Sequence, residues 1–301
     1  MKAAATPVAV GFKNILYLTD FSGPSEAALP FAIEIARDFG ATVHAMNLLI
    51  LPGYVYTTPD LTAVAIQAEE QTAVAEMKKV ETQLAGVPHD VTVERATEVW
   101  EPVEQALAKQ KIDLIILGTH GRTGAQRLLL GSVAEEIFRR SPVPVLTVGP
   151  RVRGETEEIA QIKRILFASD FSAEATAAAP YAVALASKEN AQLILLHVIP
   201  KPRGASGADM SRAAISVAEA MHRLYEIPAK EAELSASPEL AIEYGDAAER
   251  IIEAAKQRQA DLIVLGIRGA IGVPGAATHL ERPVAHKIVV NAPCPVLAIR
   301  G

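Results

Sequence analysis

The sequence contains the same unit twice, and this duplication limits the chain to folds that one half can form alone. Residues Lys13–Ser22 read KNILYLTDFS, and Lys163–Ser172 read KRILFASDFS. Further along, Asp113–Gly118 (DLIILG) returns as Asp261–Gly266 (DLIVLG). The copies lie about 150 residues apart, which is the length of one ordinary domain. The chain is therefore a tandem duplication of one domain.

A polar stretch that contains glycines and a proline, residues 149–158, separates the two copies and is typical of a linker. We therefore expect one domain over residues 1–150 and a second over residues 151–301. Half of the 301 residues are hydrophobic, so each domain has enough apolar side chains to bury a core of its own.

Within each half, short apolar runs alternate with segments whose apolar residues recur at helical spacing. In the first domain we expect strands at residues 15–19, 42–50, 91–95, 114–117 and 143–148, and helices at 26–39, 61–84, 100–110 and 133–140. In the second we expect strands near residues 165–168, 193–199, 241–244, 262–265 and 296–299. Strands that alternate with helices of this length predict an α/β fold, an open parallel sheet with helices on both faces.

Charge, cysteine content and hydropathy exclude several classes of protein. The formal charge is −6, with no strong block of either sign, which argues against a nucleic-acid partner because phosphate backbones need a basic face. The single cysteine, Cys294, permits no disulfide within the chain and suits a reducing compartment. No apolar run is long enough to span a bilayer, so we expect a cytoplasmic protein without membrane contact.

The segment from Gly118 to Ser132 has the layout of a phosphate-binding loop. A buried apolar run ends at Gly118, a second glycine follows at Gly121, and Gly131-Ser132 precede a helical pattern. Glycines allow a backbone to approach an anion closely, and the exposed N–H groups of a helix start point toward it. The complete spacing, Gly-x2-Gly-x9-Gly-Ser, is far more restrictive than a pair of glycines.

Two of these features are expected to meet at one edge of the sheet. Asp20 follows the first strand directly, and Gly118 follows the fourth. Ligands of open α/β sheets lie beyond the carboxyl ends of the strands, where the strand order reverses. If the first and fourth strands are neighbours there, Asp20 and Gly118 line the same crevice.

With these motifs in view, the chain resembles a tandem universal stress protein, with two copies of the universal stress protein A domain. The resemblance covers nearly the whole chain and implies five-stranded parallel sheets in the order 3-2-1-4-5, of the adenine nucleotide alpha-hydrolase-like type. It also implies a nucleotide-dependent stress-response function in which ATP, together with Mg²⁺, is the cofactor. The positions that it assigns to cofactor binding are Thr19, Asp20, Leu48, Gly118, His120, Gly121, Arg122, Gly131, Ser132 and Val133.

Each of these residues also has a purely structural interpretation. Asp20 is a good turn or capping residue, and Ser132 is a good helix cap. His120 and Arg122 are equally explained as solvated loop residues. What favours nucleotide binding is the combination, because helix capping does not require further glycines at fixed spacing.

The second domain departs from the pattern at its helix start. Gly266 and Gly269 are retained, as are Asp170 and Val198, which match Asp20 and Leu48. However, alignment of the following helix places Arg282-Pro283 where the first domain has Gly131-Ser132. Proline has neither an N–H nor a hydroxyl, and arginine adds a side chain where a phosphate would approach. We therefore expect one strong ATP site in the first domain and a weakened or lost site in the second.

Little in the sequence indicates catalysis or a protein-held metal. His279 and His286 stand seven residues apart without further ligands at metal-binding spacing. There is no P-loop lysine, and His120 is the one obvious base in the loop. We expect an ATP-binding regulatory protein with at most weak hydrolysis. A slow Mg²⁺-dependent ATPase and a structural stress protein without nucleotide are the alternatives.

The fifth strand of each domain is predicted to lie at a sheet edge, and such edges favour pairing with another strand. We expect residues 143–148 and 296–299 to bring the two domains together as a pseudo-dimer around an approximate two-fold axis. Further association into a homodimer is compatible with the sequence, which does not specify an interface.

Overall fold

A computed structural model describes residues 10–51, 59–119, 130–152, 161–201, 207–227, 234–268 and 284–301. Its first half contains β1 (Asn14–Leu18), α1 (Gly23–Glu26), α2 (Leu29–Phe39), β2 (Thr42–Ile50), α3 (Pro59–Gln83), β3 (His89–Ala96), α4 (Trp100–Gln110), β4 (Leu114–Gly118), α5 (Ser132–Arg140) and β5 (Val145–Val148). Its second half contains β6 (Arg164–Ala168), α6 (Ala173–Lys188), β7 (Gln192–Ile199), α7 (Gly207–Tyr225), β8 (Glu239–Tyr244), α8 (Ala247–Gln257), β9 (Leu262–Ile267), α9 (Val284–Asn291) and β10 (Val296–Arg300). The predicted strands are all present, with ends that differ by a few residues.

The ten strands form one sheet in the order β3-β2-β1-β4-β5-β10-β9-β6-β7-β8. Within each half all neighbouring strands are parallel, and the order is the predicted 3-2-1-4-5. β1 therefore lies between β2 and β4, which is the point at which the strand order reverses. The predicted fold class is confirmed in both halves.

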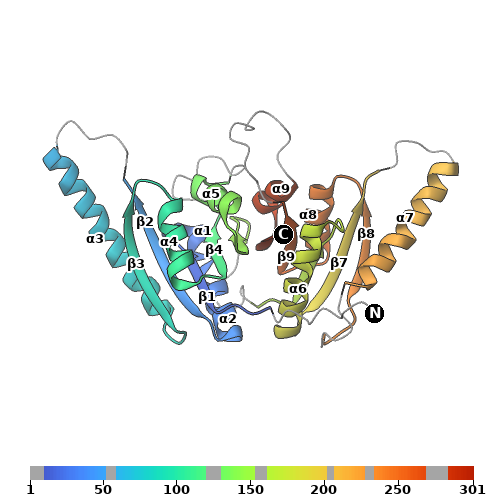
Figure 1. Ribbon diagram of the computed structural model, residues 1–301, viewed down its shortest axis with the longest axis horizontal. Helices are drawn as coiled ribbons and strands as arrows, with labels where there is room; N and C mark the ends of the chain where they lie inside the picture. Colours follow the sequence, from blue (N-terminus) through green and yellow to red (C-terminus); the bar gives the residue numbers. More distant parts are fainter. Residues whose placement is uncertain are drawn as a thin grey trace.

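The halves are joined edge to edge through their fifth strands. β5 and β10 pair antiparallel, with Leu146 opposite Leu297, and the Thr147 hydroxyl donates to the carbonyl oxygen of Val296 at 3.2 Å. The expected pairing of the two edges is thus present, and it removes both edges from solvent. Figure 1 shows the result, with α3 at one end of the molecule and α7 at the other.

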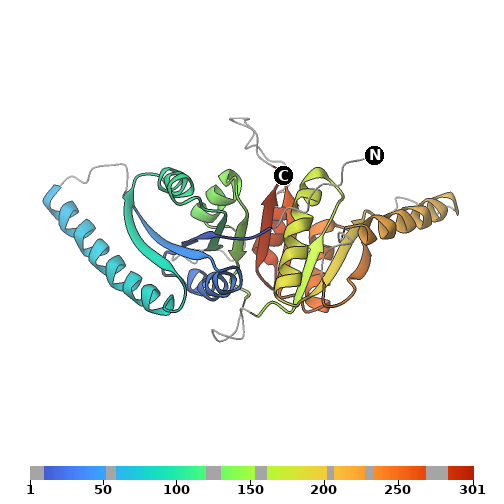
Figure 2. The same cartoon turned by 60° about the horizontal axis from the view of Figure 1, so that its bottom comes forward.

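Helices cover both faces of this sheet, and two apolar cores lie beneath them. One core packs α2 and α3 of the first half, with α6 and α7 of the second, against one face. The other packs α4, α5, α8 and α9 against the opposite face. The turned view in Figure 2 shows the two halves as separate layered units that meet at the central strands. Alternate residues of each strand supply the two cores, as expected for a sheet buried on both sides.

The helix expected over residues 26–39 is present as α2, but it begins three residues later than predicted because a break separates it from α1. The Tyr17 hydroxyl donates to the carbonyl oxygen of Ser25 at 2.8 Å, and that carbonyl also accepts from the Ala28 N–H. Pro30 alone does not explain the break, since α6 carries Pro180 at the matching position and is continuous. The matching aromatic residue beneath α6 is Phe167, which has no hydroxyl to compete for the helical carbonyl.

Two arginines cross between the halves in a reciprocal way. Arg300, at the end of β10, donates from Nη2 to the carbonyl oxygens of Phe138 (2.9 Å) and Arg139 (2.7 Å) in the last turn of α5. Arg151, just after β5, donates from Nη1 to the carbonyl oxygen of Asn291 at the end of α9, at 2.9 Å. A cation at a helix C-terminus satisfies terminal carbonyls and opposes the negative end of the helix dipole.

Among the residues that the structure describes, no helix is both long enough and apolar enough to cross a membrane.

Candidate functional site

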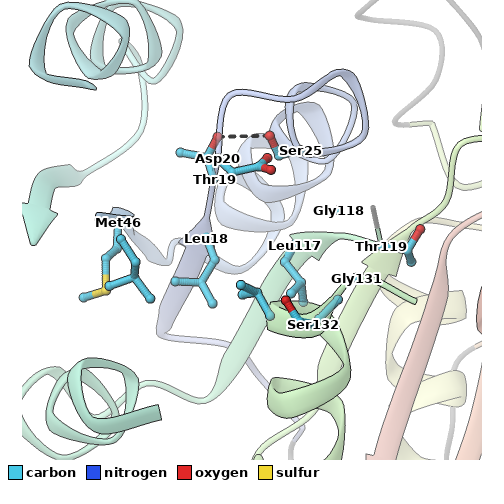
Figure 3. Close-up of a pocket in the computed structure, with 13 residues that line it drawn as sticks. Leu18, Thr19, Asp20, Ser25, Met46, Leu117, Gly118, Thr119, Gly131 and Ser132 are labelled. Carbon is cyan, nitrogen blue, oxygen red and sulfur yellow. Dashed lines mark hydrogen bonds between the residues drawn. The ribbon is translucent and has the colours of Figure 1, made fainter. Parts of the chain in front are cut away.

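A pocket of about 150 Å³ lies in the first half where β1, β2 and β4 end and α5 begins. Figure 3 shows side chains from all four elements facing it. Seven of the predicted site residues line it: Thr19, Asp20, Leu48, Gly118, Gly131, Ser132 and Val133. The expected crevice shared by Asp20 and Gly118 therefore exists, because β1 and β4 are direct neighbours.

Four predicted site residues fall outside the described ranges. His120, Gly121 and Arg122 belong to the stretch 120–129, and Gly269 belongs to 269–283. Their assignments remain predictions.

Six further residues line the pocket that the sequence did not single out: Leu18, Ser25, Met46, Leu117, Thr119 and Ala134. The alternation of side chains along a strand places Met46 on the same face of β2 as Leu48, so that signal was present in the sequence. Ser25 had no such signal, because it reaches the pocket only through the turn that starts α1. Together with Leu18 and Leu117, Met46 gives the pocket an apolar wall.

Asp20 occupies a tight turn between β1 and α1. Its Oδ1 accepts from the Ser22 N–H at 3.1 Å and from the Ser22 hydroxyl at 2.5 Å. The following residue, Phe21, has φ 59, and its N–H donates to the Thr19 hydroxyl oxygen at 3.0 Å. The turn role that the sequence offered as an alternative is therefore present.

Gly118 is required for packing. A Cβ on Gly118 would lie 2.6 Å from the backbone nitrogen of Ser25 and 2.7 Å from the carbonyl carbon of Pro24. Such distances are far shorter than any van der Waals contact, so the missing side chain is what lets α1 cross the end of β4 closely. The sequence did not suggest this packing role, and the approach of a ligand to the Gly118 backbone stays a prediction.

The start of α5 supplies hydrogen-bond donors to the pocket. Gly131 is the N-cap, with φ −60 and ψ 149, and its N–H donates to the carbonyl oxygen of Thr119 at 2.8 Å. Among the described residues no side chain caps the helix, so the capping role considered for Ser132 is wrong, and Ser132 is exposed. Within the described residues the N–H groups of Ser132, Val133 and Ala134 have no acceptor. Open donors at the positive end of a helix dipole favour an anion.

The second half repeats the turn and the close packing. The Ser172 N–H donates to Asp170 Oδ1 at 3.0 Å, Phe171 has φ 61, and a Cβ on Gly266 would lie 2.3 Å from the carbonyl carbon of Glu174. Val198 packs against the core on the α8–α9 face. The scaffold is thus the same, and it does not depend on the Gly131-Ser132 pair.

The electrostatic surroundings of Asp170 are specific to the second half. Partial burial would raise the pKa of this carboxyl, but the hydrogen bonds from Ser172 and the charge of Arg268 outweigh burial and hold the pKa below its usual value. Arg268 also lies 3.8 Å from Glu174, between its Nε and the carboxylate Oε1. A protein cation therefore already accompanies the carboxylate that corresponds to Asp20.

Within the described residues no group of three or more His, Cys, Asp or Glu side chains is placed to hold a metal ion. His286 lies on α9, and His279 falls outside the described ranges.

Comparison with known proteins assigns both halves to one family. A sequence model described as the Universal stress protein family matches residues 11–149 and again residues 161–300. A universal stress protein of Methanocaldococcus jannaschii is 35% identical over 143 residues, which are 46% of this chain and 82% of that protein. Another, from Thermus aquaticus, is 33% identical over 140 residues, which are 46% of this chain and 98% of that protein. Each of these two relatives thus matches about half of the chain.

Solved structures show the same arrangement over the full length. A universal stress protein from Archaeoglobus fulgidus matches 95% of this chain and 98% of its own, with a TM-score of 0.66 at 21% identity. A protein from Pseudomonas aeruginosa matches 96% of this chain with a TM-score of 0.60 at 17% identity. At these identities the likeness concerns the fold alone.

Proposed function

The chain belongs to the universal stress protein family, and we propose that its first half is an ATP-binding regulatory site. The observation that carries the proposal is the meeting of the Asp20 turn with the uncapped start of α5 in one pocket. One end of the pocket offers hydrogen-bond donors, and the other offers a carboxylate beside an apolar wall. An adenine nucleotide would place its phosphates at the hydrogen-bond donors and its base at the carboxylate and the apolar wall.

The phosphate end is supported by the first turn of α5. The N–H groups of Ser132, Val133 and Ala134, together with the exposed Ser132 hydroxyl, give four donors without a need for a lysine. Arg300 at the other end of α5 adds a positive charge at the C-terminus, where it stabilises the helix. Mg²⁺ would be carried by the phosphates, because Asp20, the one carboxylate among the described residues that line the pocket, lies at its base end.

The base end is supported by apolar side chains and by Asp20. Leu18, Met46 and Leu48 form a wall against which a flat aromatic base packs well. The Asp20 carboxylate accepts from N–H groups, so it favours the exocyclic amino group of adenine over a carbonyl. The pocket of about 150 Å³ is smaller than those that enclose whole drug-sized ligands, so the nucleotide would extend beyond the described walls.

We assign the site to the first half alone. The second half keeps the turn and the close packing of Gly266, but Arg268 lies beside Asp170, and the sequence places Arg282-Pro283 before α9. Proline has no N–H to donate, and an arginine at the position that matches Gly131 would add a side chain where a phosphate would approach. One nucleotide per chain is therefore expected.

Binding without rapid turnover is the favoured mechanism. Hydrolysis needs a group that holds water in line with the terminal phosphate. Asp20 is engaged in its turn with Ser22, which ties its Oδ1 to the start of α1. A slow Mg²⁺-dependent ATPase is the competing hypothesis, and a structural protein without nucleotide is the third.

We also propose a cytoplasmic setting. Cys294 is free and buried, and its burial, followed by the charge of Asp261, raises the pKa of the thiol well above its ordinary value. A protonated, enclosed thiol neither forms a disulfide nor needs one, which suits a reducing compartment.

The test is calorimetric titration of the full chain with ATP and Mg²⁺, combined with measurement of ADP release. We expect one ATP per chain. The variant Gly131→Arg, which gives the first half the residue aligned in the second, should lower the affinity by about tenfold or more, as loss of charge-assisted hydrogen bonds predicts. The matched control is Gly23→Ala, because a Cβ at Gly23 meets no atom within 4 Å and Ala173 occupies the matching position.

Three results would change the assignment. ADP release that disappears in Gly131→Arg would replace the regulatory hypothesis with the ATPase. Absence of ATP binding, with no adenine nucleotide in denatured protein by mass spectrometry, would leave only the structural role. Two ATP molecules per chain would overturn the restriction to the first half.

A further inference from the structure

A cavity of about 240 Å³ lies in the second half, at the carboxyl ends of β7 and β8 and beside the start of α8. Most of the described residues that line it are charged, and none of them lines the pocket at α5 in the first half. This charged cavity is therefore separate from the proposed ATP site. Its lining residues are Lys201, Tyr244, Gly245, Asp246, Glu249 and Arg250.

The turn between β8 and α8 fixes the position of Arg250. The Gly245 N–H donates to the carbonyl oxygen of Ile199 at 3.0 Å, which ties the turn to the end of β7. Gly245 has φ 144, a conformation that favours glycine. A Cβ at this position would lie 3.3 Å from Arg250 Cγ and 3.5 Å from its Cδ. The absence of a side chain on Gly245 thus leaves room for Arg250 to lie across the turn.

Asp246 is fixed at the start of α8. It is the N-cap of this helix, and its Oδ1 accepts from the Glu249 N–H at 3.0 Å. A helix start that is already capped by a carboxylate, with a further acidic residue in its first turn, does not attract an anion by itself. The preference of the cavity for a ligand is therefore set by its charged side chains.

The four charged side chains of the cavity are not paired with one another. Among the described residues, none of Lys201, Asp246, Glu249 and Arg250 takes part in an ion pair. Arg258, on the same helix, does form one, with 2.8 Å between its Nε and Glu239 Oε1. Two cations and two carboxylates that face one cavity without direct contact leave room for a ligand that bears both charges.

The first half has no cation at the position of Arg250. Lys111 and Gln259 are the left-handed residues near the ends of α4 and α8, with φ 53 and φ 52. The residues nine positions before them, Pro102 and Arg250, are therefore equivalent. Since Pro102 is uncharged and buried, the shared fold does not require a cation at this position.

The first half also has no cation at the position of Lys201. Leu48 in β2 matches Val198 in β7, and three residues later the two halves carry Leu51 and Lys201. Both cations of the cavity thus belong to the second half alone. Charges that one copy of a duplicated fold has and the other lacks are not needed for folding, which favours a role in binding.

We propose that the charged cavity binds a free α-amino acid through both of its charged groups. The carboxylate of the ligand lies between Lys201 and Arg250, and a guanidinium suits it because it donates two parallel hydrogen bonds. The ammonium group lies at Asp246 and Glu249, which accept hydrogen bonds. A ligand with a single charge is attracted by one pair and repelled by the other. The volume is smaller than that of sites for drug-sized ligands, which suits so small a molecule.

The experiment is titration of the full chain with L-alanine, followed by the NMR signal of the Gly245 amide, which reports on the cavity wall. Two derivatives serve as comparisons, because L-alaninamide lacks the carboxylate and N-acetyl-L-alanine lacks the ammonium group. We expect L-alanine to bind with a Kd on the order of 1 mM, since contacts between exposed charges contribute little each. Each derivative should bind about fivefold more weakly or worse. Equal affinity for either derivative, or a Gly245 signal that L-alanine does not shift, would overturn the proposal.

Arg250→Gln tests the end of the cavity that receives the carboxylate. We expect it to lower L-alanine affinity about fivefold, because a charge-assisted pair of hydrogen bonds is lost. The matched control is Lys256→Gln, which removes a positive charge from an exposed position of the same helix and should leave the affinity unchanged. Unchanged affinity in Arg250→Gln, or an equal loss in the control, would contradict the assignment. If Arg250→Gln does not fold, Lys201→Leu takes its place, copies Leu51 and should weaken binding about threefold.

Glu249→Gln separates an amino-acid site from a simple anion site. It should weaken L-alanine binding about threefold, because one contact with the ammonium group is lost. The same change should strengthen the binding of N-acetyl-L-alanine, because it removes a repulsion from an anion. Stronger binding of both ligands would show that the cavity selects anions and would overturn the proposal. ATP affinity should stay unchanged in all these variants, so failure of either site is visible without the other.

Discussion

The two halves share a turn and a close contact, and they differ where those features open toward solvent. In both, an aspartate accepts from the N–H of the serine two residues later, at 3.1 Å in the first half and 3.0 Å in the second. In both, a glycine near the end of the fourth strand of that half lies against the helix that follows the first strand. These shared features belong to the scaffold, because they occur with and without the Gly131-Ser132 pair.

The differences are therefore the more informative signal of ligand binding. The first half begins α5 with an uncapped glycine, and it has a groove between α2 and α3 that is lined by Phe21, whereas Arg223 lies on Phe171 in the second half. In the second half Arg268 accompanies Asp170, and Arg223 accompanies Phe171. Asp170 and Phe171 thus each lie near an arginine of the protein. Their counterparts in the first half, Asp20 and Phe21, line cavities.

The largest effect is expected from the glycine shared by both halves. Gly118→Ala should destabilise the chain by about 2–3 kcal/mol, because its Cβ would overlap the backbone of Ser25 and neither chain segment is free to move. Gly266→Ala should cost a similar amount, since its Cβ would overlap Glu174 in the same way. Thermal and chemical unfolding of both variants measure this.

The two substitutions separate packing from ligand approach. A Gly118→Ala variant that is as stable as the unmodified chain but has lost ATP binding would show that the glycine is needed for the ligand. Gly23→Ala is the control, with a stability close to that of the unmodified chain, because there is open space around Gly23.

A smaller effect is expected from the reciprocal arginines. Arg300→Ala should destabilise the chain by about 1 kcal/mol, because it leaves two carbonyls at the end of α5 without their charged donor. Since α5 begins at the proposed phosphate site, the same change should weaken ATP binding by about threefold through the helix dipole.

Arg151→Ala is the matched variant for that comparison. It removes the equivalent bonds to Asn291 at the end of α9, so it should lower stability but leave ATP affinity unchanged. Equal losses of ATP affinity in the two arginine variants, measured by calorimetry, would indicate that the whole contact between the halves is weakened and that the effect does not act through α5.

The smallest effect is a dependence on pH at the contact between α2 and α6. Burial, then the hydrogen bond and charge of Asp38 and the charge of Glu34, raise the pKa of Glu189 to about 8, against a weaker opposing effect of Lys188. The folded chain thus keeps a proton that the unfolded chain has lost. The contribution of this proton to the free energy of unfolding is complete below the unfolded pKa of 4.5 and is lost as pH rises to about 8.

Glu189→Gln should remove this decline. The thermal midpoint of the variant should therefore exceed that of the unmodified chain by a larger margin at about pH 8.5 than at about pH 5. Glu81→Gln on the exposed side of α3 is the control and should leave the pH dependence unaltered. If the thermal midpoint of Glu189→Gln depends on pH as that of the unmodified chain does, Glu189 does not hold this proton at the contact between the halves.

The sequence predicted the sheet more completely than the cavities. The repeat of Lys13–Ser22, followed by alternating strands and helices, was enough for a parallel sheet in each half. The resemblance to the family supplied the strand order that brings Asp20 and Gly118 to one edge. It did not predict the break between α1 and α2, because that depends on a hydrogen bond from Tyr17 to Ser25 across two elements. It also did not predict the packing of Gly118 against Pro24, since that contact joins residues far apart in the chain.

What the sequence by itself determined is the duplicated α/β fold and the single complete Gly-x2-Gly-x9-Gly-Ser spacing, because both are periodic or local patterns. Only the tertiary structure decided that β5 and β10 pair antiparallel with Leu146 opposite Leu297, and that a glycine is the N-cap of α5. It also decided that a groove between α2 and α3 is lined by Phe21 and that Arg223 lies on Phe171. These features depend on which side chains meet across separate elements, and such meetings have no counterpart in the order of residues along the chain.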